Sequence, residues 1–378
     1  MAAQADAGRS PSPPAQHIEY RAQVQPAPKV HLSPSTYGLG PPEGNSPAFW
    51  SRDGAPYLHV LTNNGRKTLR LSAPASNRWD SAWQTVPVDL PRSVVGREPA
   101  LYIEAVERDD EGILFGWYHL EIETCGVKGD EPPCDLRGLM APAIGMAIST
   151  DDGKHWIDRG LILTGEAAPC STWNGNGNFN GGNGDFCVVL DPSHRFLFFY
   201  FTNYFGEPEE HGIALARMPW SARGEIPPSR FVEKWFGGAW SEAGLGGRAS
   251  AIIPAAVAWD EPDYESYWGP AVHYNTYLDA LVMILNHTTG AGGDACWPSR
   301  NEKIYIAYCP DPSHPAVWTG PVPLVSPVLG RTRYPQLLGT GPGETDRMVG
   351  RTARLFLHGT STWLITFFRQ APNGPARR

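Results

Sequence analysis

Residues 149–156 have the sequence Ser-Thr-Asp-Asp-Gly-Lys-His-Trp, in which serine, aspartate, glycine and tryptophan stand at a spacing that predicts a tight turn between two strands. We expect the Asp151 side chain to accept hydrogen bonds from backbone N–H groups of the turn, and Gly153 to supply a positive φ. Trp156 then packs the turn onto its sheet. The stretch therefore predicts a β-hairpin that serves folding rather than chemistry.

Outward from this hairpin, the chain shows almost no helical period and consists of short apolar stretches in pairs. The pairs are 49–50 with 57–61, 101–106 with 113–118, 186–190 with 196–201, 271–277 with 281–285, and 355–358 with 363–367. Aspartate, glycine and serine stand in most of the connecting segments, as expected for turns between strands. A polar segment rich in small residues precedes each pair, at 44–50, 97–105, 180–186, 267–275 and 333–339. These segments recur after roughly 60 to 80 residues, which suits one four-stranded blade with its loops.

The repeats predict an all-β fold, a five-bladed β-propeller. The hairpin at 149–156 matches the Asp-box of sialidases and other propellers, which favours a propeller over a β-sandwich. We expect residues 1–16 to be a disordered leader and residues 17–378 to form a single propeller domain. Strands at 17–24 and 29–32 are expected to close the ring by pairing with the C-terminal blade.

The composition suits a globular protein that does not bind nucleic acid. Hydrophobic residues make up 41% of the 378 residues and charged residues 19%, enough apolar material for a large core. The net charge is −8 and no run of lysine and arginine occurs, which argues against nucleic acid or an anionic membrane as partner. No apolar stretch approaches the ~20 residues of a membrane span. The 14 tryptophans offer platforms on which sugar rings stack.

The six cysteines form no CxxC pair, so no zinc site is predicted. Cys125 and Cys134 flank the polar loop GVKGDEPP, which predicts a small disulfide ring and an oxidising compartment. Buried free cysteines are the alternative. We therefore expect a secreted or periplasmic protein, although residues 1–16 lack the apolar run of a signal peptide.

Polar and aromatic residues recur where a propeller opens. The first strand of each blade lines the central channel, and its start lies at the same rim as the end of the antiparallel second strand. Candidates for substrate binding at this mouth are Asn45, Ser46, Trp117, His119, Asn183, Asn203, Tyr204, Trp268, His273, Asn275, Tyr334 and Gln336. Amides and carboxylates hydrogen-bond sugar hydroxyls, and aromatic rings stack on sugar C–H faces. The alternative is that these side chains satisfy backbone groups in tight loops.

Three carboxylates fall at the same mouth. Asp185 follows the Gly/Asn-rich segment 180–184, while Glu104 and Glu121 belong to the neighbouring unit. Glycoside hydrolysis needs two carboxylic groups that flank the scissile bond, one as acid and the other as base or nucleophile. Asp185, Glu104 and Glu121 are therefore the catalytic candidates. The alternative for Glu104 is an ion pair with an arginine such as Arg97.

Two histidines also fall on strands that face the channel. His119 and His273 could orient a carboxylate, hydrogen-bond in the core, or hold a structural Ca²⁺ in the central channel through water. His273 is the one residue considered as a Ca²⁺ ligand. No other metal ligand and no other cofactor is predicted. Tyr118 and Tyr274 stand beside these histidines and would allow a His/Tyr acid–base pair. Strand alternation argues against the pair, because neighbouring residues point to opposite faces.

Several of these segments together resemble a group of bacterial glycosidase-like five-bladed propellers. The segments are NSPA at 45–48, GWYH at 116–119, GGNGDF at 181–186, WGPAVHYN at 268–275 and YPQ at 334–336. The likeness covers residues 40–370. The wider clan contains arabinanases, β-xylosidases and fructosidases. The resemblance implies that three carboxylates on the inner strands of blades 1, 2 and 3 serve as base, pKa modulator and acid.

By blade, the resemblance implies that Glu104 is the modulator and Asp185 the acid. The blade 1 position holds Asn45, whose amide cannot act as a general base. Glu121 or another loop carboxylate then takes that role, or the mechanism differs, or the protein does not hydrolyse sugars. We predict a glycoside hydrolase that acts on a poly- or oligosaccharide. The alternatives are a non-catalytic carbohydrate-binding propeller and a polysaccharide lyase with His/Tyr chemistry. The acidic net charge argues against an anionic substrate, unless Arg248 and Arg333 lie at the mouth.

Overall fold

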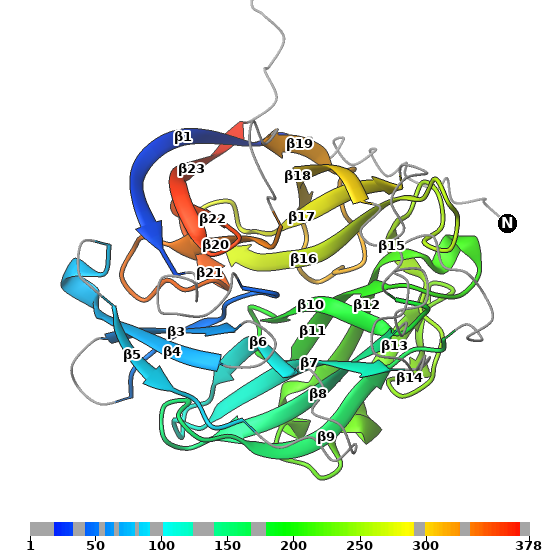
Figure 1. Ribbon diagram of the computed structural model, residues 1–378, viewed down its shortest axis with the longest axis horizontal. Coiled ribbons are helices and arrows are strands. Elements are labelled where there is room, and N and C mark those ends of the chain that lie inside the picture. Colours follow the sequence, from blue (N-terminus) through cyan, green and yellow to red (C-terminus); the bar gives the residue numbers. More distant parts are fainter. Residues whose placement is uncertain are drawn as a thin grey trace, which may run out of the picture.

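The computed structural model describes residues 19–32, 42–52, 57–63, 68–79, 83–90, 101–123, 140–167, 179–290, 299–325 and 333–370. Within these ranges the strands form five sheets around a common centre (Figure 1). The fold is therefore all-β, a five-bladed β-propeller, as predicted. The helices of this part are single 3₁₀ turns, η2 (Ala75–Asn77), η4 (Pro208–Glu210), η5 (Trp220–Ala222) and η6 (Pro228–Phe231). None of the described helices is long and apolar enough to cross a membrane.

Blades 1 and 2 each have four antiparallel strands in chain order. Blade 1 contains β2 (Ala48–Trp50), β3 (Tyr57–Asn63), β4 (Thr68–Pro74) and β5 (Gln84–Pro87). Blade 2 contains β6 (Leu101–Arg108), β7 (Leu114–Glu123), β8 (Met140–Ser149) and β9 (Ile157–Thr164). The predicted strand pairs of both blades are therefore confirmed.

Blades 3 and 4 are larger. Blade 3 contains β10 (Asn183–Leu190), β11 (Phe196–Asn203), β12 (Gly212–Pro219), β13 (Glu233–Phe236), β14 (Ala239–Ala243) and β15 (Ala251–Pro254), the last of which pairs with β12. Blade 4 contains β16 (Glu265–Asn275), β17 (Ala280–Gly290), β18 (Ser299–Cys309) and β19 (Val322–Val325), and the short β21 (Met348–Val349) pairs with β16 in parallel. The predicted hairpins 186–201 and 271–285 are the inner two strands of these blades.

Blade 5 joins the two ends of the described chain. It contains β20 (Pro335–Gly339), β22 (Thr352–Leu357), β23 (Thr360–Gln370) and β1 (Glu19–His31). β1 pairs antiparallel with β23 from Glu19 opposite Gln370 to His31 opposite Thr360, which confirms the predicted closure of the ring. One prediction is corrected, because residues 335–339 are themselves the inner strand rather than a lead-in to it. The five-residue run begins with proline and ends with glycine, which are poor strand signals.

The hairpin between β8 and β9 has the predicted turn chemistry. Asp151 Oδ1 accepts hydrogen bonds from the backbone N–H groups of Lys154 and His155, at 3.1 and 3.0 Å. Gly153 has a φ of 76°, and the buried Trp156 ring lies against Gly116. Ser149 pairs with Leu114 at the start of β7, whereas Glu121 lies near the other end of that strand. The turn is therefore remote from the predicted mouth.

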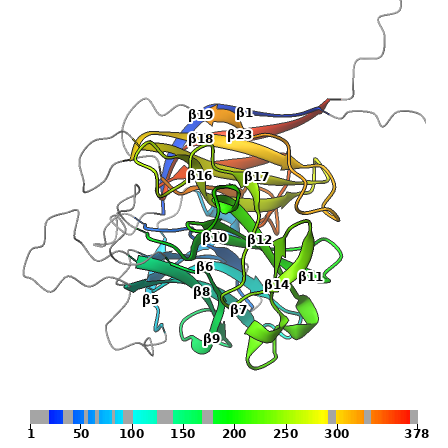
Figure 2. The ribbon, with the colours of Figure 1, turned by 90° about the vertical axis from the view of Figure 1, so that its right-hand side faces the viewer.

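Apolar contacts between neighbouring blades form the core. In the side view, the labelled strands of blades 4 and 5 lie above those of blades 2 and 3 (Figure 2). Between blades 2 and 3, for example, the buried Trp117 ring meets Phe199 with the ring centres 5.8 Å apart. Two buried cysteines, Cys187 and Cys309, are free thiols. The predicted Cys125–Cys134 ring lies outside the described residues, and the disulfide stays a prediction.

Candidate functional site

The inner strands of three adjacent blades are irregular at equivalent places. The register of β6 shifts at Glu104, that of β10 at Asp185, and that of β16 at Gly269–Pro270. An extra residue in one strand breaks the alternation of side chains and gives its own side chain a new direction. Asp185 also has a φ of 42°, which is uncommon for a residue other than glycine. These bulges bring Glu104 and Asp185 to the same histidine.

That histidine, His119 of β7, lies among the three predicted catalytic carboxylates. Its Nδ1 is 3.3 Å from Glu104 Oε1, and its Nε2 is 3.9 Å from Glu121 Oε1. The backbone N–H of Asp185 points at Nδ1 from 3.2 Å. Nδ1 donates to Glu104 when it carries a proton and accepts from Asp185 when it does not. The structure therefore gathers Glu104, Glu121, Asp185 and His119 into one cluster.

The pKa values of Glu104, Glu121 and His119 differ from those of exposed groups. Burial raises the pKa of Glu104 to about 7, although contact with His119 opposes the rise. Burial acts to lower the pKa of His119, but the hydrogen bond and the charge of Glu104 outweigh it and raise that pKa to about 9. Burial also raises the pKa of Glu121. Glu104 and Glu121 thus keep a proton to higher pH than exposed carboxyl groups, which is a property of general acids.

Tyrosine hydroxyls and aromatic rings form the wall next to this cluster. The Tyr204 hydroxyl donates a hydrogen bond to Asp185 Oδ2. Burial raises the pKa of Tyr204 and of Tyr334 well above the ordinary value, so both hydroxyls stay protonated. The Tyr334 ring meets Trp268 edge-on, with centres 5.6 Å apart. Tyr204 thus contacts Asp185, and Tyr334 and Trp268 contact each other beside it; their role in substrate binding stays a prediction.

A carboxylate that sequence reasoning missed also reaches this cluster. Glu43, an exposed residue in the segment that leads into β2, accepts a hydrogen bond from the Tyr102 hydroxyl at 3.3 Å. Its negative charge contributes to the raised pKa of Glu121, after burial and the charge of Asp185. The Glu121 side chain is 21% exposed, while that of Glu104 is 1% exposed. Solvent therefore reaches Glu43 and Glu121 but not Glu104.

Asn45, the residue that departs from the resembled pattern, ties three blades together. Its Nδ2 donates hydrogen bonds to the carbonyl oxygens of Phe186, at 2.9 Å, and of Pro270, at 3.3 Å. An aspartate here would lose both donors and face two carbonyl oxygens with its charge. Gln336 similarly accepts from the N–H of Ser46 and donates to its carbonyl oxygen, at 2.9 and 2.6 Å. The amide nitrogen of Asn45 and the amide of Gln336 thus hold blades together.

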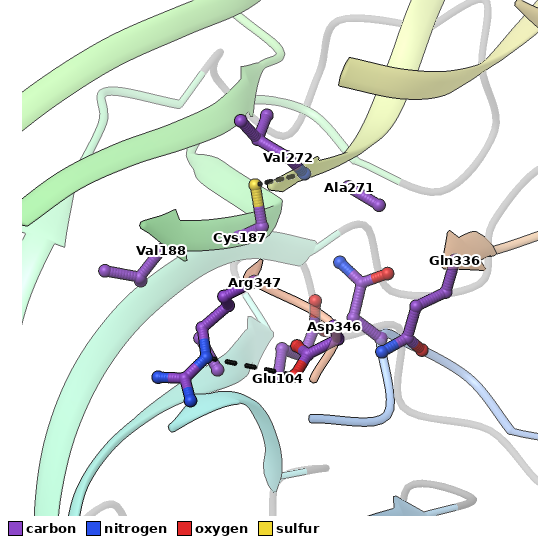
Figure 3. A pocket seen from close by; sticks show the side chains of 10 residues that line it. Glu104, Cys187, Val188, Ala271, Val272, Gln336, Asp346 and Arg347 are labelled. Carbon is purple, nitrogen blue, oxygen red and sulfur yellow. Dashed lines mark hydrogen bonds and ion pairs between the residues drawn. The ribbon is translucent and has the colours of Figure 1, made fainter. Parts of the chain in front are cut away.

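A small cavity lies on the axis among residues of all five blades (Figure 3). Its volume is about 10 Å³, room for a single water. Asp346 and Arg347, two further residues that sequence reasoning missed, line it beside Glu104. Arg347 Nη1 pairs with Glu107 Oε2 at 2.6 Å. This set does not fit the predicted Ca²⁺, because a guanidinium group already adjoins the carboxylates and His273 is not in the lining. No group of three or more metal-ligating side chains occurs within the described ranges.

Three predicted site residues lie elsewhere. Trp117 is fully buried in the core between blades 2 and 3, although it lies on the same face of β7 as His119, two residues away. His273 is 1% exposed and packs on Phe367 at 5.8 Å, and burial lowers its pKa to about 3. Asn275 caps the turn at the far end of β16, where its Oδ1 accepts the N–H groups of Tyr277 and Leu278. The long β16 carries its last residues away from the mouth.

The predicted His/Tyr pairs are also absent from the described mouth. The Tyr118 hydroxyl donates to Asp158 Oδ1 at 2.8 Å, and the Tyr274 hydroxyl donates to Asp279 Oδ1 at 2.5 Å. Neither tyrosine therefore directs its hydroxyl at the histidine beside it in sequence, as strand alternation predicts. Arg97 lies outside the described residues, so its pairing with Glu104 stays untested.

A buried polar chain supports the start of β10. Lys234 Nζ of β13 donates to the carbonyl oxygens of Thr164, at 2.8 Å, and Gly247, at 2.7 Å, and to Asn183 Oδ1, at 2.8 Å. Asn183 Nδ2 in turn donates to Asn203 Oδ1 at 2.7 Å. Because lysine only donates, this order fixes both amide orientations. Asn183 and Asn203 therefore support the mouth. No feature of the sequence predicted that Lys234 would hold them.

No protein-family model and no curated protein matches this sequence. Solved structures do match it. A glycosyl hydrolase from Bacteroides ovatus is 13% identical, with a TM-score of 0.44, over 92% of this chain and 90% of that chain. An exo-1,5-α-L-arabinanase from a bovine ruminal metagenomic library is 11% identical, with a TM-score of 0.44, over 87% and 93%. An α-L-arabinanase from Cellvibrio cellulosa is 10% identical, with a TM-score of 0.39, over 86% and 90%. The chain is thus similar to propeller glycoside hydrolases at low identity.

Proposed function

We propose that this protein is a glycoside hydrolase that acts on a neutral poly- or oligosaccharide at the mouth of the propeller. The observation that supports it is the meeting of Glu104, Glu121 and Asp185 around His119, with two of the three on strand bulges. Strained backbone and buried titratable groups of this kind gather at functional sites.

In this proposal, Asp185 and a second, solvent-reachable carboxylate act on the glycosidic bond. Glu121 has a raised pKa and 21% of its side chain exposed, which suits the acid or its partner. Glu43 supplies the carboxylate of blade 1 that Asn45 does not. Glu104 lies behind His119 and acts through it, by holding the imidazolium that balances the other carboxylates. This role resembles that of a pKa modulator.

The charge at the mouth favours a neutral substrate. The carboxyl groups of Glu104 and Glu121 flank His119, the backbone N–H of Asp185 points at the same ring, and Glu43 bonds to Tyr102, whose ring lies against it. Of the two arginines predicted for the mouth, Arg248 is paired with Glu210, whereas Arg333 precedes Tyr334 and its charge acts to lower the Tyr334 pKa. The carboxyl groups outnumber this one arginine, which disfavours a polyanion such as a uronic-acid polymer. Together with the outward-turned Tyr118 and Tyr274, this argues against the polysaccharide lyase.

The non-catalytic alternative loses its main support. That alternative was motivated by the amide at Asn45, and the two carbonyl oxygens around Nδ2 give this amide a structural reason. A binding protein also has no need for a buried Glu104 with a pKa raised to about 7.

A product assay tests the proposed function. The pure protein is incubated with neutral arabinans, mannans, galactans and xylans and with uronic-acid polymers, and the products are analysed by mass spectrometry. We expect saturated oligosaccharides or monosaccharides from one neutral polymer. Unsaturated products from a uronic-acid polymer would establish a lyase. Binding of a glycan with no product across the whole panel would establish a binding propeller.

A second prediction concerns the proton on His119. In Glu104→Gln, the carboxylate that holds the imidazolium is lost, so burial should bring the pKa of His119 well below about 9. The alkaline limb of the pH–activity profile should move to lower pH with it. The pKa is read from the His119 ring signals in an NMR titration, assigned with His119→Gln.

The matched control is Glu265→Gln in blade 4. Glu265 contacts His287 Nε2 at 3.0 Å in the same kind of pair, but outside the cluster. This variant should leave His119 and the pH–activity profile unchanged. An unaltered pKa of His119 in Glu104→Gln would remove Glu104 from the proposed role.

A further inference from the structure

A second hollow lies beside the mouth, at the end of β11. Its volume is about 310 Å³, within the range of small-molecule sites. We call it the β11 pocket. Its lining side chains are Glu166, Asn203, Phe205, Glu207, Glu210 and Arg248, and the backbone of four glycines completes it. Glycines leave backbone N–H and C=O groups open to a ligand.

Contacts with Glu210 and Phe236 fix the position of Arg248 in this pocket. Its Nε donates to Glu210 Oε1 at 2.9 Å, and Nη2 bonds to the same oxygen. The guanidinium also lies over the Phe236 ring, 4.7 Å from the ring centre. A guanidinium has five N–H donors, so the contact with one oxygen of Glu210 leaves donors for a ligand. The Arg248 side chain is 51% exposed, while that of Glu210 is 6% exposed.

The acceptors of the pocket are two exposed carboxylates, Glu166 and Glu207. Within the described residues, neither side chain makes a hydrogen bond. The charge of Glu207 contributes to the raised pKa of Arg248, after the hydrogen bond with Glu210. With Arg248 already paired, the pocket is net negative, which disfavours anionic ligands.

We propose that the β11 pocket is a second carbohydrate site, which binds one neutral sugar residue through adjacent hydroxyl groups. Such a diol both donates and accepts, and here it meets Arg248 as donor and Glu207 or Glu166 as acceptor. Phe205 offers a ring for the C–H face of the sugar. The choice of a carbohydrate rests on the proposed function.

The position of the pocket links it to the mouth. Asn203 lines the β11 pocket, and the next residue, Tyr204, reaches Asp185. Asn203 is the last residue of β11 and Tyr204 follows it, so the two sites lie next to each other at the end of this strand. A polysaccharide held in the pocket would therefore have its chain close to the proposed catalytic cluster.

Titration of the isotope-labelled protein with single glycosides tests the proposal, with the backbone amide signals of Phe205, Gly246 and Gly247 as readout. The probes are methyl α-D-mannopyranoside, methyl β-D-galactopyranoside and methyl α-L-arabinofuranoside, with methyl β-D-glucuronide as the anionic counterpart. We expect a neutral glycoside to shift these signals and the glucuronide not to. Arg248→Lys, which keeps the charge but loses the planar donors, should weaken binding about tenfold.

Glu207→Gln should also weaken binding, whereas Glu209→Gln is the matched control. Glu209 is exposed in the same loop but does not line the pocket. Each of three results would overturn the proposal. They are shifts confined to the mouth, no shift by any probe, and wild-type affinity in both Arg248→Lys and Glu207→Gln. Pocket binding without any polymer cleavage would overturn the proposed function instead, and cleavage without pocket binding would leave it standing.

Discussion

Asp185→Asn should lower kcat/KM for the cleaved glycan at least about 100-fold while leaving the fold intact. Asp185 lies on the bulge of β10, where its backbone N–H points at His119 and its carboxylate accepts the Tyr204 hydroxyl. Asparagine tolerates the left-handed backbone of this position better than other residues that carry a side chain. Its amide oxygen can still accept from Tyr204. The variant therefore removes charge and proton transfer but keeps shape, and activity is measured with unfolding curves alongside.

The chain offers a close control in Asp279→Asn. Asp279 also has a positive φ, 56°, and also accepts a tyrosine hydroxyl, that of Tyr274, but at the far end of blade 4. It should keep full activity. If Asp185→Asn is as active as Asp279→Asn, Asp185 is no part of the mechanism. Loss of activity together with a lower free energy of unfolding would point to a structural role.

Lys234→Met should lower the free energy of unfolding by about 3 kcal/mol or more, because it leaves three buried oxygens without a donor, at about 1–3 kcal/mol each. Methionine fills the space of the lysine stem but cannot donate. Burial already lowers the pKa of Lys234 to about 7, which shows how far the group is from water. Denaturant unfolding at a pH below this value, where the ammonium form is present, measures the difference.

Lys303→Met in β18 is the comparison, since Lys303 is exposed. It should change the free energy of unfolding by less than about 0.5 kcal/mol. An equally small effect of Lys234→Met would mean that the three oxygens find other donors. Because Lys234 fixes Asn183 and through it Asn203, we also expect activity to fall before the protein unfolds.

The sequence by itself determined the architecture. Alternating apolar pairs, turn residues and the 149–156 hairpin predict five blades, because strand period and turn chemistry are local properties. Local signals also predicted the ring closure by β1. They failed at β20, where a run of five residues between proline and glycine is too short to show a period.

Sequence reasoning also predicted that Glu104, Glu121, Asp185 and His119 lie at one rim. The start of a first strand and the end of the antiparallel second strand lie at the same edge of a blade. The same rule assigned Trp117, His273 and Asn275 to that rim, and there it was wrong. Burial and position along a strand depend on the length of each strand and on which blade packs against it.

Only the tertiary structure decided how the candidates contact one another. The bulges at Glu104 and Asp185 break the period-two alternation on which sequence reasoning depends. Glu43, Lys234, Asp346 and Arg347 have partners far away in the chain, as Arg347 with Glu107 illustrates. The pKa of Glu104 follows from burial among those partners. Strand order is set by local preference, whereas the chemistry of the mouth depends on contacts between blades that come together only when the ring closes.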